Sequence, residues 1–181
     1  MKTSTLVSIL PLVAAHSASQ RCSNSPSNAT IPEECCCMTY KAACTMNMER
    51  MFHIKIFYNR KQGITPDEFN DYWANSHRAL ATPFHLRLGV VKYSQYHSTP
   101  DFRDLGRVEG ALPILEFDGA AEFWVYNLET FQAMGNDPEY LSKIQPDEAN
   151  FIDLESMRMI IGVDYIAVEN QNAVKEHGRS F

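Results

Sequence analysis

The clearest alternation of apolar and polar residues starts near residue 51. Between Met51 and Tyr58 one face of the segment is apolar and carries Phe52, Ile54, Ile56 and Tyr58. Alternation with a period of two is typical of a strand whose apolar face packs against a core. We therefore predict a β-strand over Met51–Tyr58.

A helix is predicted shortly after this strand. Thr65, Pro66 and Glu68 stand where a capping box places its N-cap residue, its first helical proline and its acid. Inward positions then recur at helical spacing, as Phe69, Tyr72, Trp73, Ser76, His77 and Leu80. His77 is thereby predicted on the inward face. Because proline disfavours helical geometry in the residue before it, Pro83 is expected to end the helix and His85 to lie at the surface.

The remaining pattern completes a small α+β domain. Further extended segments are predicted over Val90–His97, over Ala111–Phe117 and Ala120–Tyr126 with an interruption at Asp118-Gly119, and over Met157–Val168. A polar loop is expected over Ser98–Glu109, and helices are expected from Asn127 and Asp137. This order of elements predicts a ferredoxin-like βαββαβ fold, with both helices on one face of an antiparallel sheet. The other face is left without a cover, so we expect a symmetric homodimer.

The composition narrows the class of protein. The chain has 181 residues, 45% of them hydrophobic, and a formal net charge of −6. The hydrophobic share excludes a wholly disordered chain. The acidic balance argues against a nucleic-acid partner, which needs a basic face. No apolar run reaches the roughly 18 residues of a membrane-spanning helix, so no membrane partner is expected.

The five cysteines divide the chain, because all of them lie between Cys22 and Cys44. They follow a lysine and a short apolar run that are typical of a secretory signal peptide. We predict a signal-like, Cys-rich leader over residues 1–50 that is disordered or processed, a folded domain over 51–169 and a polar tail over 170–181. A real leader implies secretion, whereas a translation start near Met46–Met51 implies a cytoplasmic protein.

Motifs in the folded part resemble the EthD-domain family. Asn59 to His77, with Thr65-Pro66-Asp67-Glu68-Phe69 and Tyr72-Trp73-Ala74-Asn75-Ser76-His77, is similar to the start of that domain. Asp118-Gly119-Ala120-Ala121-Glu122-Phe123-Trp124 resembles its D-G-x-A-E-x-W pattern, and residues 137–153 resemble a branch found in fungal polyketide clusters.

The resemblance implies a dimeric α+β barrel with a cleft between sheet and helices. It implies a cofactor-free decarboxylase or dehydratase acting on polyketide intermediates such as atrochrysone carboxylic acid or naphthopyrones. It also places His77 and His97 on histidines of the family. The chain departs from the family at Ala79, where His-x-Pro-Leu is usual.

Histidines are the candidate catalysts, because imidazole exchanges protons near neutral pH. His77 is the first candidate, and a core histidine bonded to a backbone carbonyl is the alternative. His97 is the second candidate, since it shares a strand face with Tyr93 and Gln95. Three polar groups on one face indicate a lined cavity that binds substrate, although a solvated strand end gives the same pattern.

Further substrate contacts are expected from His53, Lys55 and Trp73. A lysine in a cleft can bind a carboxylate or an enolate oxygen, but an alternating strand also turns such residues toward water or a partner. Trp73 can stack on a flat polyketide or simply fill the core. No H-x-x-H spacing and no glycine-rich nucleotide loop is present, so neither a metal nor another cofactor is predicted.

These features favour a cofactor-independent lyase that tailors a polyketide. The reaction is loss of carbon dioxide from a β-keto acid or loss of water from a β-hydroxy ketone, and both stay open. Two other functions also stay open. One is a cofactor-free monooxygenase of anthrones or quinols on the same barrel. The other is a secreted dimeric module that binds small ligands.

Overall fold

The computed structural model describes residues 47–181. The five cysteines and most of the leader predicted over residues 1–50 therefore lie outside the described residues.

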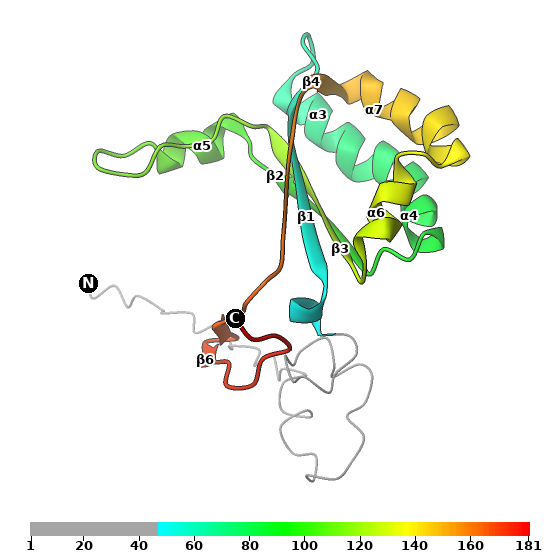
Figure 1. The fold of residues 1–181 in the computed structure, drawn as a ribbon. Coiled ribbons are helices and arrows are strands. Elements are labelled where there is room, and N and C mark those ends of the chain that lie inside the picture. Colours follow the sequence, from blue (N-terminus) through cyan, green and yellow to red (C-terminus); the bar gives the residue numbers. More distant parts are fainter. Residues whose placement is uncertain (1–46) are drawn as a thin grey trace, which may run out of the picture.

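A four-stranded antiparallel sheet forms the centre of the domain (Figure 1). Its strands, in spatial order, are β2 (Lys92–His97), β3 (Gly119–Val125), β1 (Phe52–Arg60) and β4 (Ile152–Gly162). Ile54 of β1 stands opposite Phe123 of β3 and Ile161 of β4, so these three side chains point to the same face. The predicted ferredoxin-like α+β fold is confirmed.

Helices cover one face of this sheet (Figure 1). The run after β1 consists of α3 (Pro66–Asp71), η2 (Tyr72–His77) and α4 (Arg78–Arg87). The run after β3 consists of α6 (Leu128–Met134), η3 (Tyr140–Ile144) and α7 (Gln145–Phe151). The predicted helix starts are confirmed by their caps. Thr65 Oγ1 accepts a hydrogen bond from the Glu68 amide at 3.2 Å, and Asn127 Oδ1 accepts one from the Thr130 amide at 2.9 Å.

A π-helical turn, η2, changes which residues of the first helical run face the sheet. A π turn holds one more residue than an α turn, so the inward stripe moves by about one position after it. Phe69, Trp73 and His77 are buried as predicted, whereas Ser76, also predicted to face inward, is exposed. After the π turn, Leu80 is 37% exposed, which makes its predicted inward position wrong. The residues buried instead are Ala81, Phe84 and His85.

The helix also continues through Pro83, so the prediction that it ends there is wrong. Pro83 lies inside α4, and it is exposed, as is Ala79 one turn earlier. The carbonyl of Ala79 loses its helical partner at a position where water can bind it, which keeps the cost of the missing hydrogen bond low. His85 is consequently helical and buried rather than at the surface.

Strand boundaries differ from the prediction at two places. Residues 111–117 form no strand, and the predicted polar loop contains a helix, α5 (Pro100–Gly106). The last strand of the sheet begins at Ile152 and ends at Gly162, earlier than predicted. After the buried Ile152, its first half carries the polar residues Asp153, Glu155 and Ser156, because β4 is an edge strand and pairs there with Asn59 and Arg60 across a bulge.

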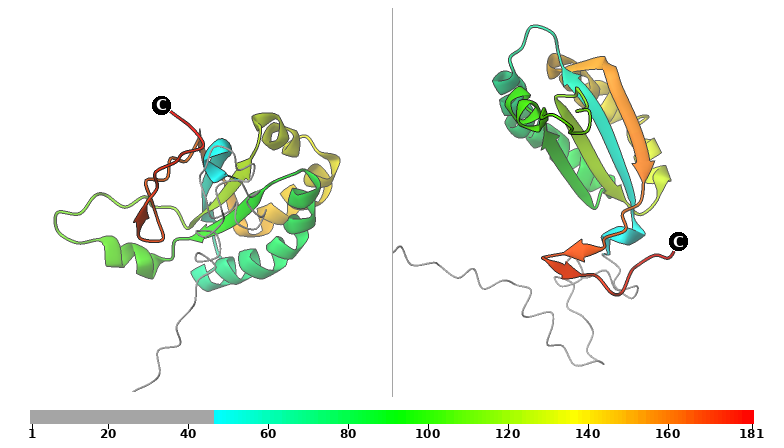
Figure 2. Two further views of the ribbon diagram at one scale, coloured as in Figure 1. Left: turned by 90° about the horizontal axis from the view of Figure 1, so that it is seen from below. Right: turned by 90° about the vertical axis from the view of Figure 1, so that its left-hand side faces the viewer.

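Residues 98–117, here called the arm, project away from the helical layer (Figure 1, Figure 2). The arm consists of α5 and the segment that returns to β3. Five of its large apolar side chains are 63% or more exposed, namely Phe102, Leu105, Val108, Leu112 and Leu115. So many exposed apolar side chains on one projection are typical of a surface that contacts another molecule.

The base of the arm is fixed by Asp118. Its carboxylate accepts hydrogen bonds from Arg60 Nη1 at 2.7 Å, from the Arg60 amide at 3.0 Å and from Arg103 Nη2 at 3.2 Å. The next residue must be glycine, because a Cβ at Gly119 would lie 2.6 Å from the ring of Trp73. The Asp-Gly pair of the sequence motif therefore holds the arm and makes room for the core tryptophan.

The C-terminal residues return to the start of the domain. Glu49, in the turn η1 (Met48–Arg50), is fully buried. Its carboxylate accepts hydrogen bonds from the amides of Ile166 at 2.6 Å and Gly178 at 2.8 Å, and His177 Nδ1 lies 2.9 Å away. Two short strands, β5 (Val168–Glu169) and β6 (Asn172–Ala173), pair between these contacts. The predicted polar tail is thus tied to the entry of β1.

Within residues 47–181, no helix combines the length and the apolar character that crossing a bilayer requires.

Candidate active site

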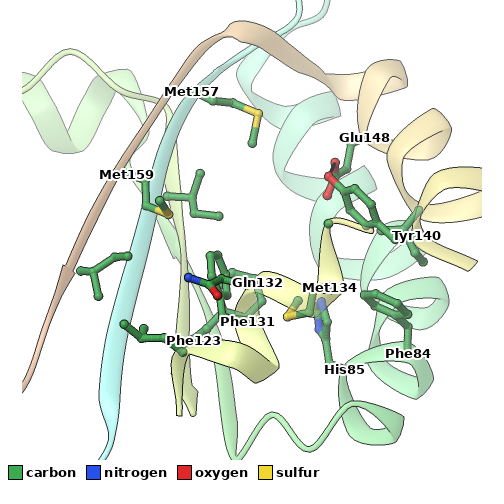
Figure 3. A pocket seen from close by; sticks show the side chains of 15 residues that line it. Phe84, His85, Phe123, Phe131, Gln132, Met134, Tyr140, Glu148, Met157 and Met159 are labelled. Carbon is green, nitrogen blue, oxygen red and sulfur yellow. Dashed lines mark hydrogen bonds between the residues drawn. The ribbon is translucent and has the colours of Figure 1, made fainter. Parts of the chain in front are cut away.

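A cavity of about 300 Å³ lies between the helices and the sheet (Figure 3). Its apolar walls come from both layers and consist of Ile56, Phe84, Phe123, Leu128, Phe131, Met134, Ile144, Met157, Met159 and Ile161. Small-molecule sites span roughly 300 to 1,000 Å³, so this cavity suits a compact ligand of two or three fused rings.

The polar side chains of the cavity are His85, Gln132, Tyr140 and Glu148. Glu148 and Tyr140 lie together on the helical side, and the Tyr140 hydroxyl donates a hydrogen bond of 2.9 Å to Glu148 Oε2 (Figure 3). Burial raises the pKa of Glu148 to about 7; the bond from Tyr140 opposes this rise, and the charge of Asp147 adds to it. Glu148 is therefore a carboxyl group that can give or take a proton near neutral pH.

His85 enters the cavity from α4 and is only 7% exposed. Its Nδ1 atom is buried without a hydrogen-bond partner among residues 47–181. Its ring packs against Tyr93 and Phe123, with centroids 4.7 and 5.3 Å away. Burial, assisted by the nearby His77, lowers the pKa of His85 to about 4. At neutral pH His85 is thus an uncharged imidazole with unused hydrogen-bonding capacity.

His77 lies beside the cavity and is not one of its lining residues. It is 4% exposed, and its Nδ1 atom is 2.7 Å from Asp147 Oδ2. The Tyr72 hydroxyl donates to the other oxygen of Asp147 at 2.6 Å. Burial lowers the pKa of His77, and Asp147 opposes this effect. The pair ties η2 to α7, one residue before Glu148.

The predicted polar strand face is a single hydrogen-bonded cluster. The Tyr93 hydroxyl accepts from Trp73 Nε1 at 3.1 Å and from Gln95 Nε2 at 3.3 Å, and His97 Nε2 lies 3.3 Å from Gln95 Oε1. Burial raises the pKa of Tyr93 to about 12 and lowers that of His97. The predicted grouping of Tyr93, Gln95 and His97 on one strand face is confirmed, but neither they nor Trp73 line the cavity. Their link to it is the Tyr93 ring, which packs on His85.

His53 and Lys55 point to the opposite face of the sheet, since Ile56 next to them lines the cavity and strand side chains alternate. The His53 ring is 7% exposed and lies between two carboxylates, with Nε2 2.8 Å from Glu122 and Nδ1 2.8 Å from Asp164. Lys55 Nζ is 3.6 Å from Glu122. The structure therefore separates this pair from His77, His97 and the cavity.

No group of three potential metal-ligating side chains is present in the described part of the chain. The cavity residues offer proton transfer, with a neutral imidazole as acceptor and a carboxyl group of near-neutral pKa as donor.

The model of the EthD domain matches residues 61–155, which is more than half of the chain. The chain belongs to the EthD domain family. The matched part of this EthD domain contains His77, His97, His85, Tyr140 and Glu148, and it leaves β1 and most of β4 outside.

Curated relatives of this EthD protein come from fungi. It is 23% identical over 136 residues to the dehydratase aurZ of Gibberella zeae, which covers 68% of this chain and 84% of the relative. It is 25% identical over 127 residues to the conidial pigment biosynthesis dehydratase EthD of Metarhizium robertsii, covering 64% and 83%. It is 22% identical over 116 residues to the decarboxylase claH of Passalora fulva, covering 62% and 75%.

Solved structures with a similar chain path include an EthD family protein from Bacillus halodurans and an EthD-like protein from Ralstonia eutropha. The first is 14% identical, with a TM-score of 0.45 over 64% of this chain and 99% of that one. The second is 22% identical, with a TM-score of 0.42 over 66% and 95%.

Three cavity residues of the EthD domain were missed by sequence reasoning. His85 was placed at the surface because Pro83 was expected to end the helix. Tyr140 and Glu148 fall within residues 137–153, for which the sequence predicts a helix and a family resemblance but no chemical role. A signal was nevertheless present, because Tyr140, Ile144 and Glu148 recur at helical spacing and so share one face.

Proposed function

We propose that this EthD protein is a cofactor-independent lyase that tailors a polyketide intermediate in fungal secondary metabolism. The observation that carries the proposal is that His85 and Glu148 line the same apolar cavity, one uncharged and one with a pKa near 7. The fungal relatives named dehydratase or decarboxylase support a reaction of this type.

Both candidate reactions require only a few catalytic groups. Loss of carbon dioxide from a β-keto acid leaves an enolate that the ketone oxygen stabilises, and an acid then protonates it. Loss of water from a β-hydroxy ketone requires a base for the α-proton and an acid for the departing hydroxyl. A base and an acid in a dry cavity serve either reaction, and general acid–base catalysis contributes about 10²- to 10⁴-fold to the rate.

The proton-transferring roles are proposed for His85 and Glu148, because they line the cavity. His77 was predicted as the catalyst, and this stays a prediction; its bond to Asp147 supports a positioning role for the helix that carries Glu148. The predicted roles of His97, Tyr93, Gln95 and Trp73 in catalysis or substrate binding also stay predictions. Their cluster supports the ring of Tyr93 behind His85.

We further propose that the protein is a homodimer. The arm projects from the side of the sheet that faces away from the helices (Figure 1, Figure 2), and it carries the exposed apolar residues named above. A second copy placed against this side would remove the apolar side chains of both arms from water, which favours association.

The test is turnover of a polyketide β-keto acid or β-hydroxy ketone by the full chain, followed by product analysis. His85→Gln and Glu148→Gln should each lower kcat at least 100-fold, while Glu129→Gln, an exposed glutamate on α6, should leave it unchanged. Turnover should be the same with and without oxygen. Oxygen consumption that matches product formation would contradict the lyase and favour the monooxygenase.

A further inference from the structure

We infer that the cavity selects an uncharged β-hydroxy ketone and removes water from it, and that it rejects β-keto carboxylates. This inference rests on the proposed lyase function and names the substrate class of the same site.

The first argument is the charge of the cavity wall. Its 15 lining residues include no lysine and no arginine, and the one carboxyl group among them is Glu148. A carboxylate that enters such a cavity loses its hydration without gaining a cation. When Glu148 is ionised, the bound carboxylate also meets a like charge. An uncharged ketone avoids both costs.

The second argument is the surroundings of Glu148, because the groups of residues 47–181 that shift its pKa include no cation. The titratable groups that act on it or share its cavity are Tyr140, Asp147, Tyr58, Tyr93 and His85. Three of them are phenols, one is a carboxylate and one is an imidazole that stays neutral at pH 7. Each of these groups favours the protonated form of Glu148 or is neutral toward it, except for the hydrogen bond from Tyr140.

The third argument is the match between these groups and a dehydration. Neutral His85 accepts the α-proton of the ketone while the carbon–oxygen bond of the β-hydroxyl breaks. The electrons of the broken carbon–hydrogen bond form the new carbon–carbon double bond. Protonated Glu148 donates its proton to the departing hydroxyl, which leaves as water. Return of the proton from His85 to Glu148 resets the site, so no other reactant is consumed.

The closing experiment compares two probes on one carbon frame. 3-Hydroxy-1-tetralone loses water to give 1-naphthol, and 1-tetralone-2-carboxylate loses carbon dioxide to give 1-tetralone. The full chain should accelerate the first reaction over its uncatalysed rate, with a kcat/KM at least tenfold above that for the second. An equal or higher kcat/KM for the carboxylate would overturn the inference and leave the proposed lyase standing. Acceleration of neither probe would count against both.

Binding gives a readout that is independent of turnover. 2-Acetylnaphthalene should bind at least tenfold more tightly than 2-naphthoate at pH 8 in calorimetry. Lowering the pH to 6 should reduce this difference in affinity for the native chain, because Glu148 becomes protonated. Glu148→Gln should show the reduced difference in affinity at both pH values. Glu129→Gln should behave as the native chain does. The inference is overturned if the two ligands bind with equal affinity at pH 8, or if Glu148→Gln leaves their difference in affinity unchanged.

Discussion

The Tyr140 hydroxyl donates a hydrogen bond of 2.9 Å to Glu148 Oε2 inside an apolar cavity. Burial raises the pKa of Glu148, and this bond restrains the rise because it stabilises the ionised carboxylate. The tyrosine therefore lowers the pH at which the buried carboxyl group changes from a proton donor to an anion.

Tyr140→Phe should raise the pKa of Glu148 further. If protonated Glu148 is the catalytic acid, the alkaline limb of the pH profile of kcat/KM should move to higher pH. Tyr96→Phe, which changes an exposed tyrosine on β2, should leave the limb in place. A limb that moves to lower pH would show that Tyr140 does not stabilise the ionised form.

Glu148→Gln should change how stability depends on pH. The folded-state pKa of about 7 lies above the ordinary value of 4.5. The folded protein thus binds the proton more tightly than the unfolded chain does, and this contribution to stability is lost as pH rises from about 4.5 to 7. Glu148→Gln should therefore be more stable than the native chain at pH 8, by about 2 kcal/mol, since one pKa unit corresponds to about 1.4 kcal/mol and part of the carboxyl stays solvated.

Urea denaturation at pH 4.5 and pH 8 measures this difference. Parallel pH dependences of the native chain and the variant would contradict the raised pKa of Glu148.

His85 affects the pH dependence of stability in the opposite direction. Its pKa is lowered from 6.5 to about 4, so its contribution to the free energy of unfolding is lost as pH falls through that range.

Matching glutamine variants of His85 and His77 distinguish the roles of the two histidines. His85→Gln should lower kcat by 100-fold or more, because it removes the proposed base from the cavity. His77→Gln should lower kcat less than tenfold and reduce the free energy of unfolding, because it weakens the link between η2 and Asp147. A larger loss of kcat for His77→Gln, with the fold intact by circular dichroism, would restore His77 as the catalyst.

The arm offers a test of the proposed homodimer. Leu112 and Leu115 are 87% and 67% exposed, so replacing both with serine removes little packing within one chain. Analytical ultracentrifugation should find a dimer for the native chain and a monomer for the double variant at micromolar concentration. Leu86→Ser, 69% exposed on α4, is the matched control and should remain dimeric. A monomeric native chain would contradict the proposal.

Local sequence signals predicted the framework well, for physical reasons. The capping box at Thr65 and the Asn127 cap depend on neighbouring residues only, and both are present. The alternation in β1 reflects its two-sided environment in the sheet. These features fixed the order of elements, and the order of elements determined the fold.

The cavity was harder to predict because it depends on contacts between distant segments. The position of His85 follows from a π turn and from a proline that the helix accommodates on its exposed side, and neither has a simple periodic signal. The pKa of Glu148 follows from burial beneath residues of other elements. The Tyr93, Gln95 and His97 face was predicted correctly as a group, yet the sequence does not show that Trp73 bonds to Tyr93 or that the group lies outside the cavity lining.

The π turn over Tyr72–His77 has a consequence for how such a domain diversifies. One residue gained or lost there converts between a π turn and an α turn, so the later side chains of α4 keep their directions toward the sheet. A single codon insertion or deletion can therefore change the residues beside His77 and its bond to Asp147, while Ala81, Phe84 and His85 stay inward.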